Sequence, residues 1–215
     1  MRCSLDEDLG ARLATLREQG LLRELRRVDS PQGTRIQSGG QALLNFSSND
    51  YLGLANHPAL KEAAARAVEE FGVGSGAARL ICGSLAPHHE LEAALAAFKG
   101  TEAALGFSSG YATALGAIGA LLGKDDIVVL DRRVHACIVD AARLSGATLR
   151  VFRHNDVEDL QRLLAWAREK STLLGTRNTL IVTESVFSMD GDCAPLRQLV
   201  ALKERFGVWL MVDEA

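Results

Sequence analysis

The sequence has few aromatic residues, no long hydrophobic run and no excess of basic residues. Aromatic residues make up only 5% of the 215 residues although 47% are hydrophobic, so alanine, glycine and leucine dominate, which suits closely packed helices on a sheet. The 24 basic and 27 acidic residues give a formal net charge of −3. Without a basic surplus or a polybasic run, we expect neither nucleic acid nor an anionic membrane surface as a partner.

Signals for export, membrane insertion and metal binding are also missing. The longest weakly apolar stretch, 112–123, is shorter than the roughly 20 residues that span a bilayer, and the acidic start Met1–Asp8 is unlike a secretory signal. The four cysteines are scattered, without a C-x-x-C pair: Cys3, Cys82, Cys137 and Cys193. We therefore expect a cytoplasmic protein with reduced thiols, no disulfide framework and no metal site.

The first part of the chain predicts helices separated by turn-rich segments. Leucines recur with a helical period over 5–27. Pro58 and Pro87 mark the starts of two more helices, which we expect to end near 71 and 98. The segments between the helices are rich in turn formers or glycine and cover 31–41, 45–54 and 72–83.

From residue 103 onward, apolar segments alternate with helical patterns. The predicted strands are 103–107, 127–130, 148–152, 179–183 and 208–212, and the predicted helices are 109–122, 134–145, 156–170 and 195–206. This alternation is typical of βαβ units and predicts an α/β fold with a mainly parallel sheet.

Polar residues follow four of these strands. In open α/β sheets, ligands bind beyond the carboxyl ends of the strands. Those positions hold a possible anion site at a helix start, a histidine, hydroxyls and carboxylates: Ser108, Ser109 and Gly110; Asp131 and His135; Glu184, Ser185 and Ser188; Asp213 and Glu214. The sequence therefore predicts a binding site at this edge of the sheet.

Each of these residues also has a purely structural explanation. Ser109 could be an ordinary helix cap, His135 a structural histidine, and Glu184 a cap for the following turn. Asp213 is the hardest to explain structurally, because a carboxylate after a buried strand needs a cation or several donors. The coincidence of all of them at one edge favours a functional site.

A dinucleotide-binding fingerprint occurs at Gly72–Ala77, which fits the pattern G-x-G-x-x-A. That motif must follow a strand and open a helix. A helical pattern precedes it here, so we interpret the segment as a turn or a glycine-rich loop near the active site.

Several longer motifs occur together in a fixed order. They are NFSSNDYLGL (45–54), GSGAARLICG (74–83), HELE (89–92), FSSGY (107–111), His135-Ala136, RHND (153–156), TESVFSMDGDCAPL (183–196) and VDEA (212–215). In these motifs the chain resembles the α-oxoamine synthases, enzymes of fold type I that depend on pyridoxal 5′-phosphate (PLP). The resemblance implies an aspartate-aminotransferase-like three-layer sandwich. It also implies an N-terminal helix and arm over 1–45 and an incomplete PLP-binding large domain over 46–215.

The resemblance implies a cofactor-binding role for six residues. Ser109, Gly110 and Tyr111 would contact the phosphate of PLP. His135 would stack on the pyridine ring, and Ser188 would lie near the phenolic oxygen. Asp213 would bind the ring nitrogen and keep it protonated, which makes the ring an electron sink for a carbanion.

The implied reaction joins an amino acid to an acyl-CoA or acyl-carrier-protein thioester with loss of carboxylate. Arg23, in the predicted N-terminal helix, would contact the acyl substrate, and Asn49 would lie on the substrate side. The motifs are most similar to the biotin-pathway branch, which uses alanine and a pimeloyl thioester. Glycine C-acetyltransferase, 5-aminolevulinate synthase and serine palmitoyltransferase are alternatives. A non-catalytic PLP-fold partner subunit is an alternative of another class. The family implies a homodimer.

The chain departs from the family pattern in two ways. Ala78 stands where the family has serine. The Schiff-base lysine, which follows the VDEA motif in the family, has no counterpart in this sequence. The lysines of this chain match no such position: Lys61, Lys99, Lys124, Lys170 and Lys203. We therefore expect a truncated chain that lacks the C-terminal domain, is inactive by itself and is poorly soluble. A reading frame that continues beyond Ala215 would test this.

Overall fold

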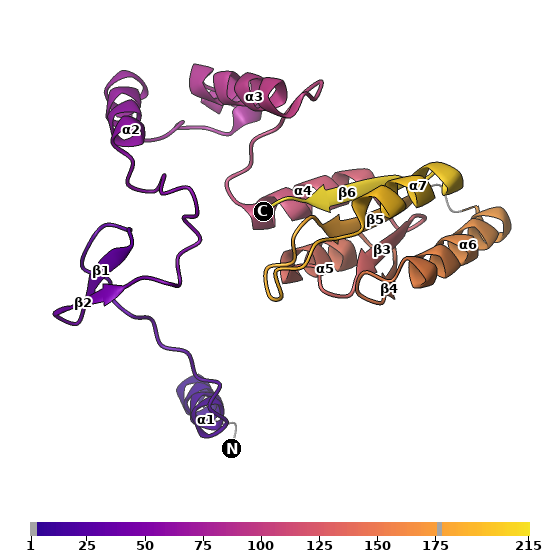
Figure 1. The fold of residues 1–215 in the computed structure, drawn as a ribbon, viewed down its shortest axis with the longest axis horizontal. Helices are drawn as coiled ribbons and strands as arrows, with labels where there is room; N and C mark the ends of the chain where they lie inside the picture. Colours follow the sequence, from indigo (N-terminus) through magenta and orange to yellow (C-terminus); the bar gives the residue numbers. More distant parts are fainter. Residues whose placement is uncertain (1–3, 176–177) are drawn as a thin grey trace. The chain divides into compact units, whose positions relative to one another are not determined.

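The computed structural model describes residues 4–175 and 178–215, which belong to two compact units (Figure 1). Unit 1 is Met1–Leu85 and unit 2 is Ala86–Ala215. Cys3 lies outside the described residues. The division that we expected at residues 45 and 46 stays a prediction.

Unit 1 consists of separate short elements: α1 (Leu5–Glu18), β1 (Arg35–Ser38), β2 (Gln41–Leu44), α2 (Pro58–Phe71) and a π-helical turn, η1 (Arg79–Gly83). Ser4 and Glu7 form a reciprocal capping box at the start of α1. Strands β1 and β2 form an antiparallel hairpin, whose turn residues Gly39 and Gly40 have φ of 57° and 76°. Such positive φ values suit glycine because it has no Cβ.

The predicted N-terminal helix is too long at its C-terminal end. Helix α1 ends at Glu18, and Gly20 follows with φ of 68°. The backbone N–H groups of Leu21 and Leu22 both turn back to the carbonyl of Leu16, at 2.8 and 3.1 Å. This left-handed glycine closes the helix, so Arg23 lies in the segment after α1 rather than on it.

Unit 2 has a four-stranded parallel sheet with the strand order β4-β3-β5-β6. Its elements are α3 (Ala86–Lys99), α4 (Gly110–Leu121), β3 (Ile127–Asp131), α5 (Ala136–Leu144), β4 (Thr148–Phe152), α6 (Val157–Leu174), β5 (Thr179–Glu184), α7 (Leu196–Phe206) and β6 (Trp209–Asp213). The strands and helices predicted from residue 109 onward are confirmed to within a few residues.

The predicted strand at 103–107 is wrong. This segment pairs with none of the four strands, and Leu105 and Phe107 are exposed. The N–H of Gly106 donates instead to the Oε1 atom of Glu92, at 2.8 Å. An apolar segment becomes a strand only where a neighbouring backbone accepts its hydrogen bonds.

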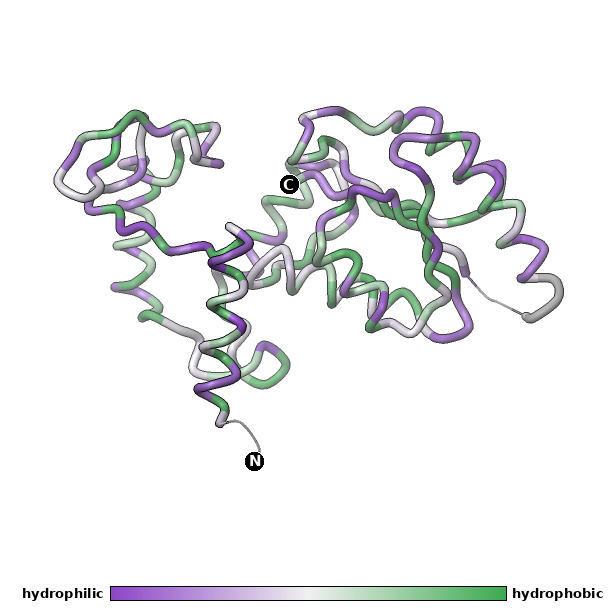
Figure 2. Tube along the Cα trace, turned by 90° about the horizontal axis from the view of Figure 1, so that it is seen from below, coloured by the Kyte–Doolittle hydropathy of each residue, from purple (hydrophilic) through white to green (hydrophobic). Residues whose placement is uncertain are grey.

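The sheet of unit 2 is covered on both faces. Val128 and Leu130 of β3 pack with α4 and α5 in one core cluster, whereas Ile127 and Val129 pack with α6 and α7 in the other. In Figure 2 the green, hydrophobic segments gather in the interior of this unit. The arrangement is the α/β three-layer sandwich that the sequence predicted.

No helix in the described ranges is long and apolar enough to cross a membrane. Cys82, Cys137 and Cys193 are free thiols.

Candidate active site

A cavity of about 460 Å³ lies in unit 2 at the carboxyl end of β6. It brings together the start of α4, the start of α5 with its N-cap residue, and the last residues of the chain: Gly110, Tyr111, Thr113, Ala114, His135, Cys137 and residues 211–215. Four of the predicted site residues, Gly110, Tyr111, His135 and Asp213, therefore line one cavity. They come from three separate segments, and the parallel sheet places the ends of these segments side by side.

The start of α4 offers unpaired backbone N–H groups to the cavity. Ser109 is the N-cap, and its Oγ atom accepts a hydrogen bond from the N–H of Ala112 at 3.1 Å. A Cβ atom built on Gly110 would meet nothing within 4 Å, so this helix end is open. The first N–H groups of a helix have no partner within it, and the helix dipole favours negative charge there. The site therefore suits an anion such as a phosphate.

His135 is held in a defined orientation. Its Nδ1 atom accepts the backbone N–H of Cys137 at 3.2 Å and lies 3.0 Å from the Sγ atom of Cys137. The backbone N–H of His135 donates to the carboxylate of Glu184. Because Nδ1 acts as an acceptor, the neutral ring carries its proton on Nε2.

Cys137 and Glu184, which contact His135, are both partly desolvated. Burial raises the pKa of the Glu184 carboxyl, and the charge of Asp213 raises it further, against hydrogen bonds from the N–H groups of His135 and Ser188. Burial also raises the pKa of the Cys137 thiol, together with the charges of Asp213 and Glu184. The thiol is therefore a neutral group and not a thiolate nucleophile.

Asp213 has no cationic partner within 4–175 and 178–215. Its Oδ1 atom accepts the N–H of Ala215 at 2.9 Å, while the neighbouring Glu214 forms the ion pair with Lys99. Asp213 is partly buried and lines the cavity. The carboxylate is thus available to a protonated group of a ligand.

These features fit PLP. An anion site, an imidazole ring and a carboxylate without a cationic partner among the described residues line one cavity, and PLP carries a phosphate, a flat pyridine ring and a protonatable ring nitrogen. The cavity volume falls within the range of roughly 300 to 1,000 Å³ that small-molecule sites have.

The other predicted site residues are not placed in this cavity. Ser188 lies in the loop after β5, and its backbone N–H bonds to the carboxylate of Glu184. Arg23 and Asn49 belong to unit 1, where Asn49 accepts the N–H of Tyr51 through its carbonyl at 2.9 Å. Their roles stay predictions.

Sequence reasoning did not identify Cys137 as part of the site. Cys137 is two residues after His135, the position whose N–H commonly returns to the side chain of the N-cap residue. That spacing was the signal that could have found it.

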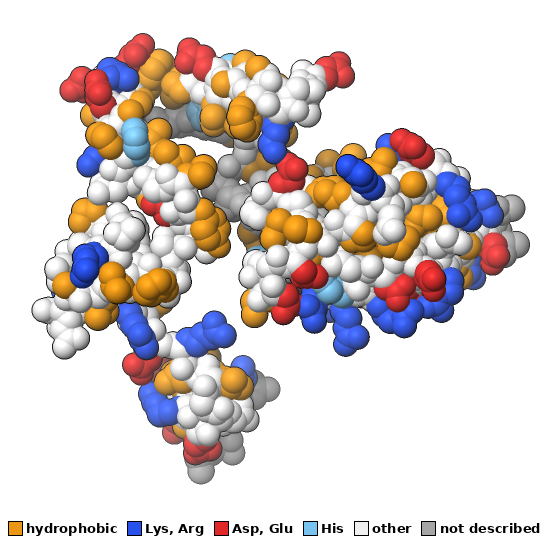
Figure 3. All heavy atoms as spheres, viewed as in Figure 1, with side chains coloured by type: hydrophobic (Ala, Val, Ile, Leu, Met, Phe, Trp, Pro, Cys, Tyr) orange, Lys and Arg blue, Asp and Glu red, His pale blue; other side chains and the backbone are white. Residues whose placement is uncertain are grey.

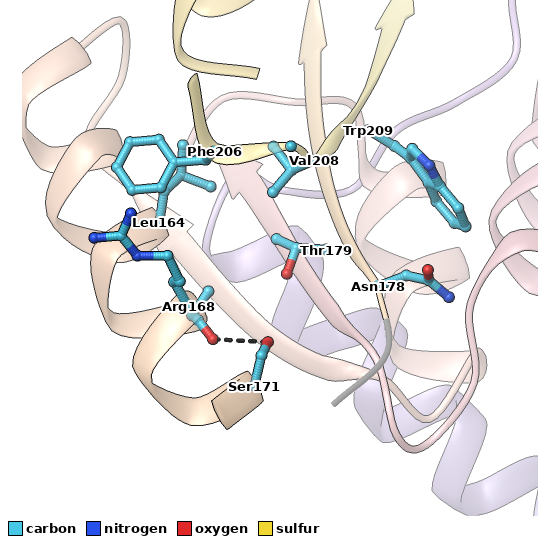
Figure 4. Close-up of a pocket in the computed structure, with 10 residues that line it drawn as sticks. Leu164, Arg168, Ser171, Asn178, Thr179, Phe206, Val208 and Trp209 are labelled. Atoms are coloured by element: carbon cyan, nitrogen blue, oxygen red, sulfur yellow. Dashed lines mark hydrogen bonds between the residues drawn. The ribbon is translucent and has the colours of Figure 1, made fainter. Parts of the chain in front are cut away.

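A second cavity, of about 190 Å³, lies at the amino ends of β5 and β6 (Figure 4). Leu164 and Arg168 from α6, Phe206 at the end of α7, and Trp209 line it. It contains none of the predicted site residues and lies at the end of the sheet opposite to the one where α/β folds bind ligands.

Comparison with known proteins identifies the family. The sequence model of the family "Aminotransferase class I and II" matches residues 41–215. The chain belongs to this family. This family membership agrees with the fold type I resemblance drawn from the motifs.

Two curated relatives with the same name match nearly the whole chain. The chain is 54% identical over 209 residues to a protein of Geotalea daltonii named 8-amino-7-oxononanoate synthase, a match that covers 97% of this chain and 52% of that protein. A protein of the same name from Beijerinckia indica is 48% identical over 212 residues, with 99% and 54% covered. The chain thus spans about half the length of the curated relatives it matches.

Solved structures show the same fold. Serine palmitoyltransferase from S. paucimobilis, solved with a PLP–myriocin aldimine, matches with a TM-score of 0.87 and 33% identity over 99% of this chain and 53% of that chain. The 8-amino-7-oxononanoate synthase of Francisella tularensis matches with a TM-score of 0.62 and 29% identity, over 79% and 44% of the two chains.

Proposed function

We propose that the protein carrying this chain is a PLP-dependent C-acyltransferase that condenses an amino acid with an acyl thioester and releases carbon dioxide. The observation that carries the proposal is the convergence of the α4 start, His135 and the unpaired carboxylate of Asp213 on one cavity. Fold, family and the names of the relatives support the same class of reaction.

The residues of the cavity have separate roles toward the cofactor. The N–H groups at the start of α4 would bind the phosphate of PLP, and His135 would lie against its ring. Asp213 would hold a proton on the ring nitrogen. When bound, PLP supplies a cationic conjugated ring that takes up the electron pair left by the Cα proton of the amino acid.

Further roles follow for the residues around the cavity. Cys137 and Glu184 fix His135 at its ring and at its backbone. Ser188 would lie near the phenolic oxygen of PLP. The family resemblance assigns substrate contacts to Arg23 and Asn49. Related enzymes share active sites between two subunits, so we propose a homodimer. We also propose that the protein is cytoplasmic.

The preferred activity is that of 8-amino-7-oxononanoate synthase, with alanine and pimeloyl-CoA or a pimeloyl carrier-protein thioester as substrates, in biotin biosynthesis. Relatives with this name reach 54% identity, whereas the serine palmitoyltransferase structure is 33% identical. Glycine C-acetyltransferase, 5-aminolevulinate synthase and serine palmitoyltransferase activities remain the alternatives within the class. A non-catalytic partner subunit is less well supported, because it would have no need of the cofactor positions.

A chimaeric enzyme tests the proposal. This chain replaces the corresponding half of the Geotalea daltonii protein, and the release of CoA is measured with three substrate pairs. We expect turnover with alanine and pimeloyl-CoA, and much less with glycine and acetyl-CoA or with serine and palmitoyl-CoA. A chimaera that binds PLP but prefers either of the last two pairs would overturn the substrate assignment. A folded chimaera that does not bind PLP would overturn the whole proposal.

A further inference from the structure

One histidine outside the cavity is held between two carboxylates. His154 is the second residue after β4. Its Nδ1 atom is 2.9 Å from the Oδ1 atom of Asp131, and its Nε2 atom is 2.7 Å from the Oδ2 atom of Asp192. Since an ionised carboxylate only accepts hydrogen bonds, both contacts are satisfied only when each ring nitrogen carries a proton. The two short contacts therefore favour an imidazolium ion, because the Asn155 Nδ2 group lies farther from Nε2, at 3.3 Å.

The two carboxylates also accept hydrogen bonds from neighbouring groups. Asp131, whose side chain is fully buried, also accepts the N–H groups of Arg133 and Asn155, at 2.8 and 2.9 Å. The Oδ2 atom of Asp192 accepts the Nδ2 group of Asn155 at 2.9 Å. The remaining side-chain oxygens of Asn155 and Asp192 are buried without a partner. Loss of one ring proton would leave one of the two carboxylates facing a nitrogen lone pair at hydrogen-bond distance, so that contact would be lost.

Asp192 belongs to the loop 185–194, which also carries Ser188. The N–H of Phe187 donates to the carbonyl of Asp192 at 2.9 Å, and the Phe187 ring meets the His154 ring edge-on, with centroids 4.4 Å apart. The loop is also tied to the site: the N–H of Ser185 donates to the carbonyl of Asp213 at 2.7 Å, and the N–H of Ser188 bonds to Glu184. His154 therefore contacts the loop at Phe187 and Asp192, while the backbone bonds of Ser185 and Ser188 connect it to the site.

The two carboxylates that face His154 both raise its pKa. Burial alone would lower the pKa of His154, but the hydrogen bonds and charges of Asp131 and Asp192 outweigh it and raise that pKa. Arg133 pairs with Asp190 of the same loop and helps to lower the pKa of Asp192. Arg153, the residue before His154, pairs with Asp156 and Asp159. The hydrogen bond from His154 is the largest cause of the lowered pKa of Asp192.

We propose that His154 is a positioning residue: as an imidazolium ion clamped by Asp131 and Asp192, it fixes the loop 185–194 and with it Ser188 and the Glu184 contact, and it loosens this loop when it loses a proton. The consequence for Ser188 rests on the proposed function. The clamp itself does not, because every contact in it lies within this chain.

The test uses the full chain without PLP and begins with the unmodified protein. An NMR titration follows the ring of His154 and the amides of Phe187 and Ser188. The ring should titrate above its ordinary value of 6.5, and the two amides should shift with the same midpoint. A His154 midpoint at or below the ordinary value, or amides that ignore it, would overturn the proposal.

Two variants of the same loop sharpen the test. Asp192→Asn removes one arm of the clamp, so the His154 midpoint should fall, and amide exchange over 185–194 at a fixed pH should quicken by about tenfold or more, as expected for loss of a charged hydrogen bond. Asp190→Asn removes the same charge without touching His154 and should change both quantities far less. Equal effects of the two variants would show that loop charge, rather than the clamp, is responsible. These readouts need no cofactor, so a failure of the proposed function would leave them unchanged.

Discussion

Helices α2 and α4 begin with similar N-caps but differ in how far they are buried. Each has a side-chain N-cap, His57 for α2 and Ser109 for α4. Helix α2 contains no buried residue, whereas α4 buries Ala114 and Ile118 against the sheet. The same contrast separates the units, because Gly83 is the one buried residue among those described in unit 1. Caps and periodicity are local and can set where a helix forms, but burial requires a second surface.

Apolar side chains of unit 1 are consequently exposed to solvent. Leu60 and Val68 of α2 are 51% and 49% exposed, and hydrophobic side chains appear on the surface of its segments in Figure 3. In unit 2, Val128, Val129 and Ile181 are fully buried between two helical layers. The difference predicts that unit 2 carries nearly all of the cooperative stability.

The largest expected effect comes from a matched pair of leucines. Leu180→Ala, in the buried strand β5, should lower the free energy of unfolding of unit 2 by about 2–5 kcal/mol, because it opens a cavity in the core. Leu60→Ala, in α2, should leave that transition within about 0.5 kcal/mol of the parent. Urea unfolding followed by tryptophan fluorescence measures this directly, since both tryptophans, Trp166 and Trp209, lie in unit 2. Equal shifts for the two variants would contradict the predicted difference in stability between the two units.

A smaller effect is expected at the helix caps. Ser109→Ala removes the bond to the N–H of Ala112 and should cost unit 2 about 1 kcal/mol, as cap losses usually do. Ser4→Ala removes the capping box of α1 and should reduce the helical circular dichroism without moving the tryptophan transition. If Ser4→Ala shifted that transition as much as Ser109→Ala, the two units would be coupled in folding.

Smaller still is a pH dependence that belongs to unit 2. The folded state raises the pKa of Glu184 above 4.5 and that of His154 above 6.5. In the pH window between each ordinary pKa and the raised one, the folded state therefore binds more protons than the unfolded state. The free energy of unfolding should therefore fall as pH rises from each ordinary value through the raised one. Glu184→Gln should flatten the acidic window alone, and His154→Gln the upper one alone. Urea midpoints measured across pH would contradict this if they rose with pH in either window.

Local signals predicted most of the elements, and their failures share a cause. Gly20 was present in the sequence, but the leucine period ran past it and hid the end of α1. The segment 103–107 is apolar enough for a strand, yet strand formation depends on a backbone that lies elsewhere in the chain. In both cases the outcome depended on backbone hydrogen bonds that a residue pattern does not encode.

The site was predictable to the extent that sheet topology determines it. Gly110, His135 and Asp213 each follow or precede a strand or helix end, and parallel strands bring such ends together. The clamp of His154 was not predicted. Its partners Asp131 and Asp192 lie 23 and 38 residues away, and the strand order that places them together is not readable from spacing.

The central claim is that Asp213 meets the ring nitrogen of PLP, and ¹⁵N NMR of PLP labelled at that nitrogen tests it most directly. In the chimaeric enzyme loaded with this cofactor, we predict a protonated ring nitrogen in the parent and in the control Glu214→Gln, whose carboxylate pairs with Lys99. In Asp213→Asn the nitrogen should be unprotonated at neutral pH. A ring nitrogen whose protonation is the same in Asp213→Asn as in the parent would contradict the account.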